Sequence, residues 1–477
     1  MQRLIWWLRR DFRLTDNTAL TAALTDAASV IPVFILDDTL LKLPRTQGYR
    51  TAWLMDALRR FDADLRASGG CLIIRRGDPA EQLVTLCAEA DAAGVYFNRD
   101  YSGYATKRDQ AVRGALTRQG YLVRDFKDLV IHEAAEVTTS TGKGYEVYTR
   151  YRNAWSMLPK PDPLPVPTDL SCLIAPADLH SDPLPDPSQF DAAPQPICAT
   201  GEAEALRRLD YFIDGLAFRY RDQRDLPAVD GTSILSPYLR WGMISPRTCY
   251  TASIEAMHAA QHQEQRENVG TWIGELVWRE FNYQILARHP HIVRRAFRPV
   301  YDNIQWRNDP QLFALWQQGQ TGFPIVDAAM RQLNATGWMH NRARMIAASF
   351  LVKDLLIDWR WGEGYFMQRL LDGEVANNAG NWQWVAGTGT DASPYFRIFN
   401  PTTQSEKFDP TGAYIRHWVP ELRAVPDAHI HRPAGMLPME QAQCGVQIGK
   451  DYPAPIVDHA EQREHVMALY GAARQRG

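Results

Sequence analysis

The hydrophobic pattern of the first 130 residues alternates between two periods. Short continuous apolar or β-branched runs are typical of buried strands, and they occupy residues 4–8, 30–36, 71–75, 94–98 and 121–125. Between them apolar residues recur every three or four positions, as in 51–67, which is followed by the pair Gly69 and Gly70. That spacing is typical of amphipathic helices. Strands that alternate with helices predict a doubly wound, Rossmann-like parallel sheet with helices on both faces.

The middle of the chain is rich in proline. Eleven of the 30 prolines fall within residues 159–196. Proline has no N–H and a fixed φ, so this stretch is typical of an extended connector rather than a core element. Beyond it the pattern is mostly helical, most clearly at 202–218, 269–287, 324–336, 341–356 and 362–371. We therefore expect an α/β domain at 1–130, a proline-rich connector at 131–200 and an all-helical domain at 201–477.

Composition and charge narrow the function classes. Apolar residues make up 45% of the chain and charged residues 22%, as in an ordinary soluble globular protein. No stretch reaches the roughly 18 consecutive apolar residues of a membrane span. The six cysteines contain no CxxC pair, which favours a reducing cytoplasm over a disulfide framework or a zinc ribbon. Because the net charge is −3, binding to a nucleic acid would need a local basic surface.

Tryptophan is the unusual component of this chain. There are 15 tryptophans, and eleven of them lie between Trp241 and Trp418. A helical core rich in indole rings would account for this surplus. Stacking or redox chemistry would account for it equally well, and composition alone leaves both interpretations open.

Common nucleotide, hydrolase and metal motifs are absent. The first predicted strand is followed by Arg9, Arg10 and Asp11 rather than by GxGxxG, so a dinucleotide is not bound in the Rossmann manner. There is no GxxxxGKS/T loop and no GxSxG elbow. His258 and His262 have i, i+4 spacing without the glutamate of a zinc protease, which favours a solvated helix face. We expect no bound metal.

Residues 272–281 are predicted to form a helix with a polar face. Glu275, Trp278 and Arg279 are three and four residues apart and therefore share that face, whereas Leu276 and Phe281 point elsewhere. The face presents a hydrogen-bond acceptor, a stacking surface and a cation. The alternative is an ordinary amphipathic helix with a surface ion pair.

A second polar group lies in 338–345, where Asn341, Arg342 and Met345 line one side of a helix start. An amide both donates and accepts hydrogen bonds, which suits the edge of a base or a flavin ring. Arg342 and Arg344 provide the local basic surface that DNA phosphates would require. The alternative here is a solvated helix face.

Two further segments indicate a polar ligand. The hydroxyls of residues 232–236 precede a predicted helix, where free N–H groups suit a phosphate, although simple helix capping is commoner. Residues 372–384 contain two acids, three asparagines and two tryptophans. Buried amides and acids must be hydrogen-bonded, so this segment favours a site for a polar molecule.

These segments together resemble the DNA photolyase/cryptochrome family, most closely its class I cyclobutane pyrimidine dimer photolyases. The resemblance rests on LRRDFRLTDN, TSILSPYL, WIGELVWREF, TGWMHNRARM and DGEVANNAGNWQW through TGTDASPYFRIFNPTTQSEKFD, in the order of the family and across nearly the whole chain. It implies an N-terminal α/β antenna domain and a C-terminal helical domain that binds FAD. That organisation agrees with the pattern of strands and helices.

The resemblance also implies which residues hold a U-shaped FAD. They are Tyr220, Thr232, Ser233, Ile234, Leu235, Ser236, Trp272, Asn341, Asp372, Gly373, Glu374 and Asn378. Asn378 would lie near the flavin N5, and Asp372 would help to keep the reduced flavin anionic. The family usually has DGD where this chain has Glu374, so the contact of that longer acid is less defined.

The lesion site implied by the resemblance uses the polar helix face of residues 272–281. Glu275 would bind the edge of the pyrimidine dimer, with Trp278 and Trp384 on either side of the extruded dimer. The other implied DNA and lesion contacts are Arg224, Arg279, Asn341, Arg342, Met345 and Gln404. Trp306, Trp359 and Trp382 resemble the relay that carries an electron to the flavin. In the implied reaction, excited FADH⁻ donates an electron to the dimer, the cyclobutane ring splits and the electron returns.

Two alternatives remain within the family: a cryptochrome photoreceptor without repair, and a (6-4) photolyase. Asn341 and Met345 stand where (6-4) enzymes resemble one another in a histidine pair, which favours the cyclobutane lesion. A second, antenna chromophore is also implied. Arg50 and Asp100 match positions used with a deazaflavin, and Tyr104 and Ala105 lack the carboxylate of folate-binding relatives. We expect a monomer that acts on single-stranded or double-stranded DNA containing dimers.

Overall fold

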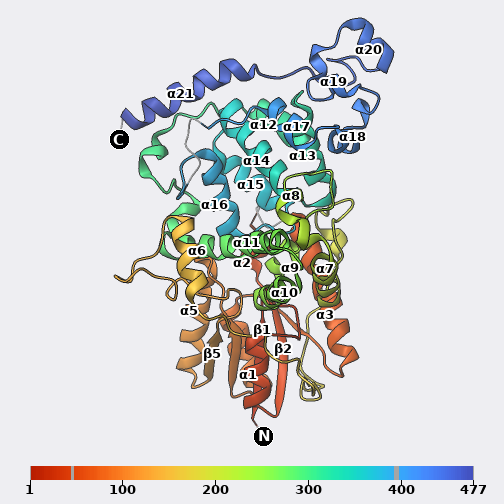
Figure 1. Ribbon diagram of the computed structural model, residues 1–477. Helices are drawn as coiled ribbons and strands as arrows, with labels where there is room; N and C mark the ends of the chain where they lie inside the picture. The colour runs from red at the N-terminus through yellow and green to blue at the C-terminus, as the bar shows by residue number, and fades with distance from the viewer. Residues whose placement is uncertain (1, 44–47, 392–396, 476–477) are drawn as a thin grey trace.

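The N-terminal part is a parallel sheet covered by helices. The computed structural model describes residues 2–43, 48–391 and 397–475. Five parallel strands have the order β3-β2-β1-β4-β5, and Figure 1 shows them at the N-terminal end of the molecule. The strands are β1 Arg3–Leu8, β2 Ser29–Leu36, β3 Ile73–Arg76, β4 Gly94–Asn98 and β5 Leu122–Phe126. All five predicted strands are confirmed: β4 has the predicted ends, and the ends of the other four differ by at most two residues.

Alternating residues of β1 point to opposite faces of the sheet. Leu4 and Trp6 belong to a core that includes side chains of α1 and α3, whereas Ile5 and Trp7 pack with those of α4 and α5. These helices are α1 Thr18–Asp26, α3 Tyr49–Ala67, α4 Pro79–Glu89 and α5 Gly103–Arg118, and the short α2 is Asp38–Leu41. The predicted doubly wound arrangement is therefore confirmed, because helices cover both faces.

The remainder of the chain is mostly helical. Its helices are α6 Tyr148–Met157, α7 Glu202–Asp214, α8 Tyr220–Gln223, α9 Ser236–Trp241, α10 Pro246–Ala259, α11 Gln263–Arg288, α12 Pro310–Gln318, α13 Pro324–Thr336, α14 Asn341–Ser349, α15 Trp359–Arg369, α16 Val375–Ala386, α17 Pro401–Phe408, α18 Ala413–Trp418, α19 Asp427–Ile430, α20 Pro438–Cys444 and α21 His459–Gln475. The predicted helix at 341–356 is α14 followed by one π-helical turn, Phe350–Asp354.

The range predicted as a connector has two different parts. Residues 159–196, all of which the structure describes, contain only the short 3₁₀ turn Pro187–Gln189 as regular structure. Residues 129–155, which we call the docking segment, are instead packed on the helical part and include most of α6. The domain boundaries at residues 130 and 200 stay predictions.

The docking segment lies along α11. The buried Glu280 carboxylate accepts hydrogen bonds from the backbone N–H groups of Ile131 and His132 and from Trp155 Nε1, the last at 2.7 Å. Other α11 side chains bond to its backbone as follows: Arg279 to Leu129, Gln284 to Tyr145 and Arg288 to Ala134. Figure 1 shows α6 beside α11 where the two parts of the molecule meet.

A buried network of charges joins the sheet to the helical part. Arg13 lies 2.6 Å from Asp128, and Arg247 of α10 lies 2.8 Å from Asp128 and 2.9 Å from Asp16. All four side chains are at most 5% exposed. Burial opposes ionisation of Asp128, but the two guanidiniums outweigh it and lower its pKa to about 2. One apolar core also runs from Leu4 of the sheet to residues of α7, α9 and α11.

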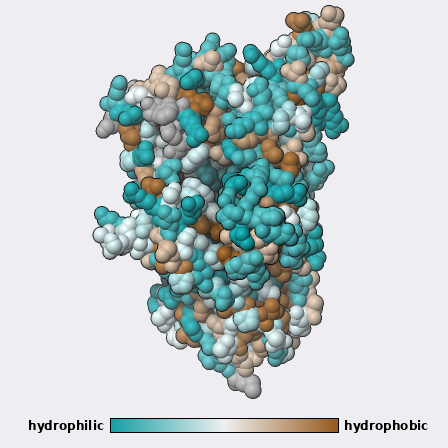
Figure 2. Space-filling view, in the orientation of Figure 1, coloured by the Kyte–Doolittle hydropathy of each residue, from teal (hydrophilic) through white to brown (hydrophobic). Residues whose placement is uncertain are grey.

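The visible surface is mainly polar. Figure 2 shows hydrophilic residues over most of this face with hydrophobic ones scattered among them, and a hollow near its middle at the level of α16. None of the helices that the structure describes is long and apolar enough to cross a membrane. The six cysteines, all within the described part, are free.

Asp128→Asn tests the charge network. Removing one partner of a buried ion pair leaves the guanidiniums incompletely compensated, so we expect a loss of about 3 kcal/mol or more. Because the pKa of Asp128 is lowered from 3.8 to about 2 on folding, this stability is complete above pH 5 and declines as the pH falls through 3.8 towards 2. Urea unfolding midpoints at pH 7, 5, 4 and 3 measure it.

Glu204→Gln is the matched control, since Glu204 forms an exposed i, i+3 pair with Arg207. It should change the free energy of unfolding by less than about 1 kcal/mol. Equal effects of the two substitutions would show that the buried network does not hold the two parts together.

Candidate functional site

Helix α11 carries Glu275 and Trp278. Glu275, Trp278 and Arg279 are partly exposed whereas Leu276 and Phe281 are buried, as the spacing predicts, but Arg279 contacts a different segment from Glu275. The Glu275 carboxylate accepts a hydrogen bond of 2.5 Å from Arg224. Burial raises the pKa of Glu275, and Arg224 opposes that shift. The carboxylate is thus oriented by one cation and keeps capacity to accept a further hydrogen bond.

The structure separates Arg279 from this pair. Its guanidinium donates to the Leu129 carbonyl at 2.7 Å and lies 5.0 Å from the centroid of Tyr283. Trp278 stacks on Tyr148 of α6, with ring centroids 3.5 Å apart and an interplanar angle of 6°. Tyr148 was not among the predicted site residues.

Asn341 and Met345 lie one turn apart on α14. His340 caps this helix, since its Nδ1 accepts from the Arg342 N–H at 3.2 Å. Asn341 is exposed, and its amide Nδ2 lies 3.9 Å from the Met345 sulfur. Arg342 pairs with Asp225 at 2.8 Å.

Asp372 joins three segments of the candidate cofactor site. Its carboxylate accepts a 2.6 Å hydrogen bond from the Ser236 hydroxyl and two from Arg344 of α14, at 2.8 and 3.2 Å. The Asp372 side chain is 4% exposed. Since Arg342 and Arg344 are both paired with carboxylates, the basic surface predicted around them is largely neutralised.

The loop before α9 has a conformation that suits an anion. Arg208 binds the carbonyl oxygens of Thr232 and Ser233 at 2.9 and 2.7 Å. Ile234 has φ +50°, a conformation that a β-branched residue adopts at a cost of roughly 1–3 kcal/mol and that is typical of ligand-binding segments. Among the described residues, none accepts a hydrogen bond from the N–H groups of Ser233 or Ile234. These donors and the nearby hydroxyls fit phosphate groups.

Asn378 lies on α16, and its amide donates to both the carbonyl and the carboxylate of Glu363 at 3.0 Å. Glu374 caps the same helix by accepting from the Asn377 N–H at 3.0 Å. The carboxylate of Glu374 also lies 3.7 Å from Arg10 of the sheet part. Glu374 therefore has a structural role in addition to any contact with a cofactor.

The two predicted antenna residues lie at the boundary next to this segment. Arg50 of α3 donates to the Gly373 carbonyl at 2.6 Å, and Asp100 pairs with Arg10 at 3.1 Å. Arg240 also donates to the Gly373 carbonyl, at 2.8 Å. Burial opposes ionisation of Asp100, but the combined attraction of four nearby arginines, with Arg10 the strongest, outweighs it and lowers the pKa of Asp100.

The aromatic candidates belong to two clusters. Tyr220 and Trp272 are buried around Phe212, with ring centroids 5.8 and 5.1 Å from it. The second cluster is a hydrophobic core with Trp359 and Trp382 as buried members, and Trp306 and Trp384 pack against that core. Trp382 contacts Phe366 at 5.0 Å and Trp316 at 6.3 Å. Trp306 contacts Tyr470 of a neighbouring core at 6.0 Å.

Two predicted features lie near the C-terminal end of this region. Gln404 lies on α17 and is partly exposed. Residues 392–396 of the motif TGTDASPYF lie outside the described residues. Among the residues that the structure describes, no three His, Cys, Asp or Glu side chains form a group that could hold a metal ion.

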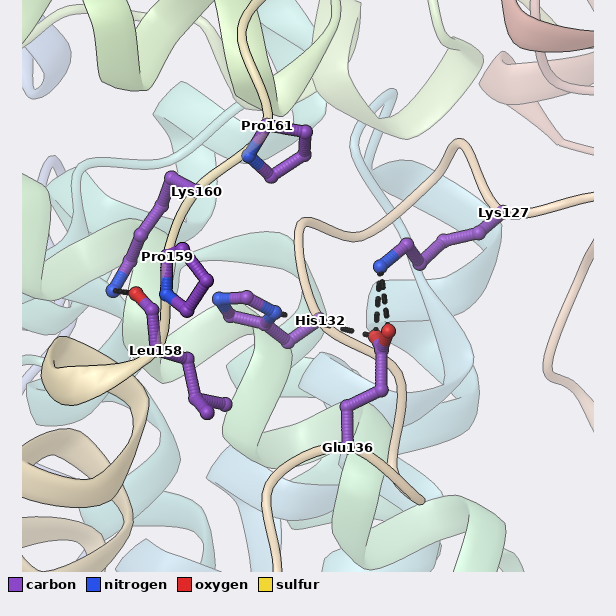
Figure 3. A pocket seen from close by; sticks show the side chains of 7 residues that line it. All are labelled: Lys127, His132, Glu136, Leu158, Pro159, Lys160 and Pro161. Atoms are coloured by element: carbon purple, nitrogen blue, oxygen red, sulfur yellow. Dashed lines mark hydrogen bonds and ion pairs between the residues drawn. The ribbon is translucent and has the colours of Figure 1, made fainter.

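A separate hollow of about 420 Å³ lies beside the docking segment (Figure 3). Its charges are already compensated: Lys127 bonds to Glu136 at 2.8 Å, and Lys160 bonds to the Leu158 carbonyl at 2.7 Å. Burial lowers the pKa of His132 to about 4, so this imidazole is neutral at pH 7. None of the predicted site residues lines this hollow.

Comparison with known proteins identifies the family to which this chain belongs. Residues 4–168 match the family model for DNA photolyase, and residues 272–472 match that for the FAD binding domain of DNA photolyase. A deoxyribodipyrimidine photo-lyase from Halobacterium salinarum is 43% identical over 98% of this chain and 99% of its own length. A full-length relative at this level of identity shows common descent, and the chain belongs to the DNA photolyase family.

Solved structures give the same result. A bacterial class III photolyase from Agrobacterium tumefaciens has a TM-score of 0.92 and 39% identity, covering 100% of this chain and 98% of that one. A Synechocystis cryptochrome has a TM-score of 0.89 and 30% identity, covering 98% and 99%. An archaeal photolyase from Sulfolobus tokodaii with two FAD molecules has a TM-score of 0.83 and 33% identity, covering 99% and 100%. The fold is confirmed, and the class I subdivision stays a prediction.

Asp372→Asn tests the cofactor site. An uncharged side chain at position 372 leaves Arg344 without its carboxylate partner and weakens the hydrogen bond from the Ser236 hydroxyl. We therefore expect FAD to bind about tenfold more weakly. The ratio of flavin to protein absorbance after purification, and titration of released FAD, measure the effect. Asp169→Asn is the control, because Asp169 is an exposed acid of the connector. Full flavin content in the Asp372 variant would contradict the assignment.

Proposed function

We propose that this protein is a deoxyribodipyrimidine photo-lyase, which uses light and FAD to split cyclobutane pyrimidine dimers in DNA. The carrying observation is the pair of Glu275 and Trp278 on one face of α11, with the Glu275 carboxylate oriented by Arg224. A carboxylate beside an indole plane suits a flat heterocycle with polar edges. Relatives named deoxyribodipyrimidine photo-lyase cover the whole chain, which supports the same activity here.

The residues around Asp372 fit a flavin nucleotide. The Thr232–Ser236 loop offers hydroxyl and N–H donors for phosphates, and the Asn378 amide is fixed in orientation by Glu363. The Asp372 carboxylate would lie near the isoalloxazine ring, and Arg344 balances the charge of this carboxylate. When bound and reduced, FAD supplies the light-excited electron that splits the dimer. The protein residues supply position and electrostatics.

The lesion would be held by stacking and one directed hydrogen bond. We place the dimer outside the duplex, between Trp278 and Trp384, with Glu275 accepting from a pyrimidine N–H. A dimer stacks poorly in DNA, so extruding it costs less than extruding a normal base. Asn341 and Met345 are close together on α14 and would contact the pyrimidine edge. Arg224, Arg279, Arg342 and Gln404 are proposed to contact DNA.

Trp382, Trp359 and Trp306 are proposed to carry an electron to the oxidised flavin. Trp359 and Trp382 are buried in one hydrophobic core, and Trp306 packs against that core. Arg50 and Asp100 are proposed to help hold a second chromophore, for which a deazaflavin is favoured over folate. The neighbour from Sulfolobus tokodaii with two FAD molecules supports a second flavin-like chromophore in this family. We further propose that the protein acts as a cytoplasmic monomer on single-stranded or double-stranded DNA.

Illumination of the reduced protein with a dimer-containing oligonucleotide tests the function. Chromatography should show restored thymines in light and none in darkness. Glu275→Ala should retain FAD but bind the dimer at least about tenfold more weakly, because a charge-assisted hydrogen bond is worth roughly 1.5–3 kcal/mol.

The matched control is Glu267→Ala. Glu267 lies on the same helix and pairs with Arg221, but it is exposed and distant from Trp278 in the sequence. This variant should repair dimers like the unmodified protein. Absence of repair by the unmodified protein would sink the proposal and leave a cryptochrome-type photoreceptor, whereas loss of FAD from the Glu275 variant would show that Glu275 belongs to the cofactor site.

A further inference from the structure

We infer that Tyr148 is a positioning residue for the pyrimidine dimer. It occupies one face of the Trp278 indole and thereby leaves the opposite face for the lesion. This inference rests on the proposed function and assigns a role to a residue of the docking segment, which lies outside the helices that carry the rest of the lesion site.

The Tyr148 and Trp278 rings lie almost directly over one another, 3.5 Å apart and at 6°. Tyr148 is only 8% exposed. Phe281 meets both rings edge-on, with centroids 5.9 Å from Tyr148 and 5.6 Å from Trp278. The indole is therefore fixed by a stacked ring on one face and by an aromatic edge beside it.

Hydrogen bonds at both ends of Tyr148 hold this stack. Its hydroxyl donates to the Gly274 carbonyl at 2.8 Å, one helical turn before Trp278 on α11. Its backbone N–H donates to the Asp391 carboxylate at 3.0 Å. Burial, reinforced by the negative charge of Glu275, raises the pKa of Tyr148, so the hydroxyl stays protonated and continues to donate. Aromatic pairs usually prefer offset or edge-on contacts, so these bonds set the face-to-face geometry.

The same residue connects the elements that carry both lesion tryptophans. Trp278 is on α11, and Asp391 lies in the loop that follows α16, the helix of Trp384. Helix α6 is fixed on α11 because Tyr151 and Trp155 also pack there, and the Tyr148 side chain is held by its burial and its bond to the Gly274 carbonyl. The stack is thus part of the structure before DNA binds, which reduces the entropy lost when the lesion is ordered between the tryptophans.

Tyr148→Met tests this role, because methionine fills similar space without a flat ring. We expect about tenfold weaker binding to a dimer-containing oligonucleotide, with affinity for undamaged DNA and flavin content unchanged. Tyr148→Phe keeps the ring, the backbone bond to Asp391 and the packing of α6, so its affinity for the dimer should stay within about threefold of the unmodified protein. Tyr145→Met is the matched control, since Tyr145 belongs to the same segment but its hydroxyl bonds to the Thr138 carbonyl rather than to α11. Fluorescence anisotropy with labelled oligonucleotides measures both affinities.

Unchanged dimer affinity in the methionine variant would overturn the inference, and so would an equal loss of affinity for damaged and undamaged DNA. Loss of FAD would also overturn it, because Tyr148 would then support the fold in general. A Tyr148→Phe variant as weak as the methionine variant would show that the hydroxyl matters rather than the stacked plane. If the unmodified protein has no preference for dimers, the proposed function itself fails, and that result is independent of Tyr148.

Discussion

The hydrogen bonding of the docking segment to α11 is the constraint on which the lesion face depends. One buried carboxylate, Glu280, collects three N–H donors from two parts of that segment. A buried carboxylate is costly unless it is fully hydrogen-bonded, so these donors and Glu280 require each other. Glu275 and Trp278 lie within the two preceding turns of the same helix. Residues 129–155 therefore hold in place the helix that presents the proposed lesion face, through Glu280 and through the Tyr148–Trp278 stack.

Several buried or half-buried arginines of this protein are paired with carboxylates rather than collected into a basic surface. Asp128 is shared by Arg13 and Arg247, and Asp372 binds Arg344. Removing one partner of such a buried ion pair lowers the stability of the fold by several kcal/mol, because the other charge is left buried without compensation. They join segments that are far apart in the sequence, which keeps the two parts of the molecule and the loops of the cofactor site in register. The net charge of −3 is compatible with this arrangement.

Much of the fold could be predicted because its signals are local. Helix α13 begins at Pro324 and ends before Gly337, which has φ +69°, as the sequence pattern predicts. The polar face of α11 follows from residue spacing alone. The role of Tyr148 could not be predicted, because a stacking partner 130 residues away leaves no local signal. The pairing of Arg342 and Arg344 with acids is equally non-local.

We propose that the docking segment and α11 leave a single face of Trp278 for an extruded pyrimidine dimer. A crystal structure of the protein with duplex DNA containing one thymine dimer would show which face of Trp278 the lesion occupies. We predict that the dimer lies outside the duplex on the Trp278 face opposite Tyr148, with Glu275 at a pyrimidine edge. A dimer that stays stacked in the duplex, or that displaces Tyr148 and takes its place, would contradict the account.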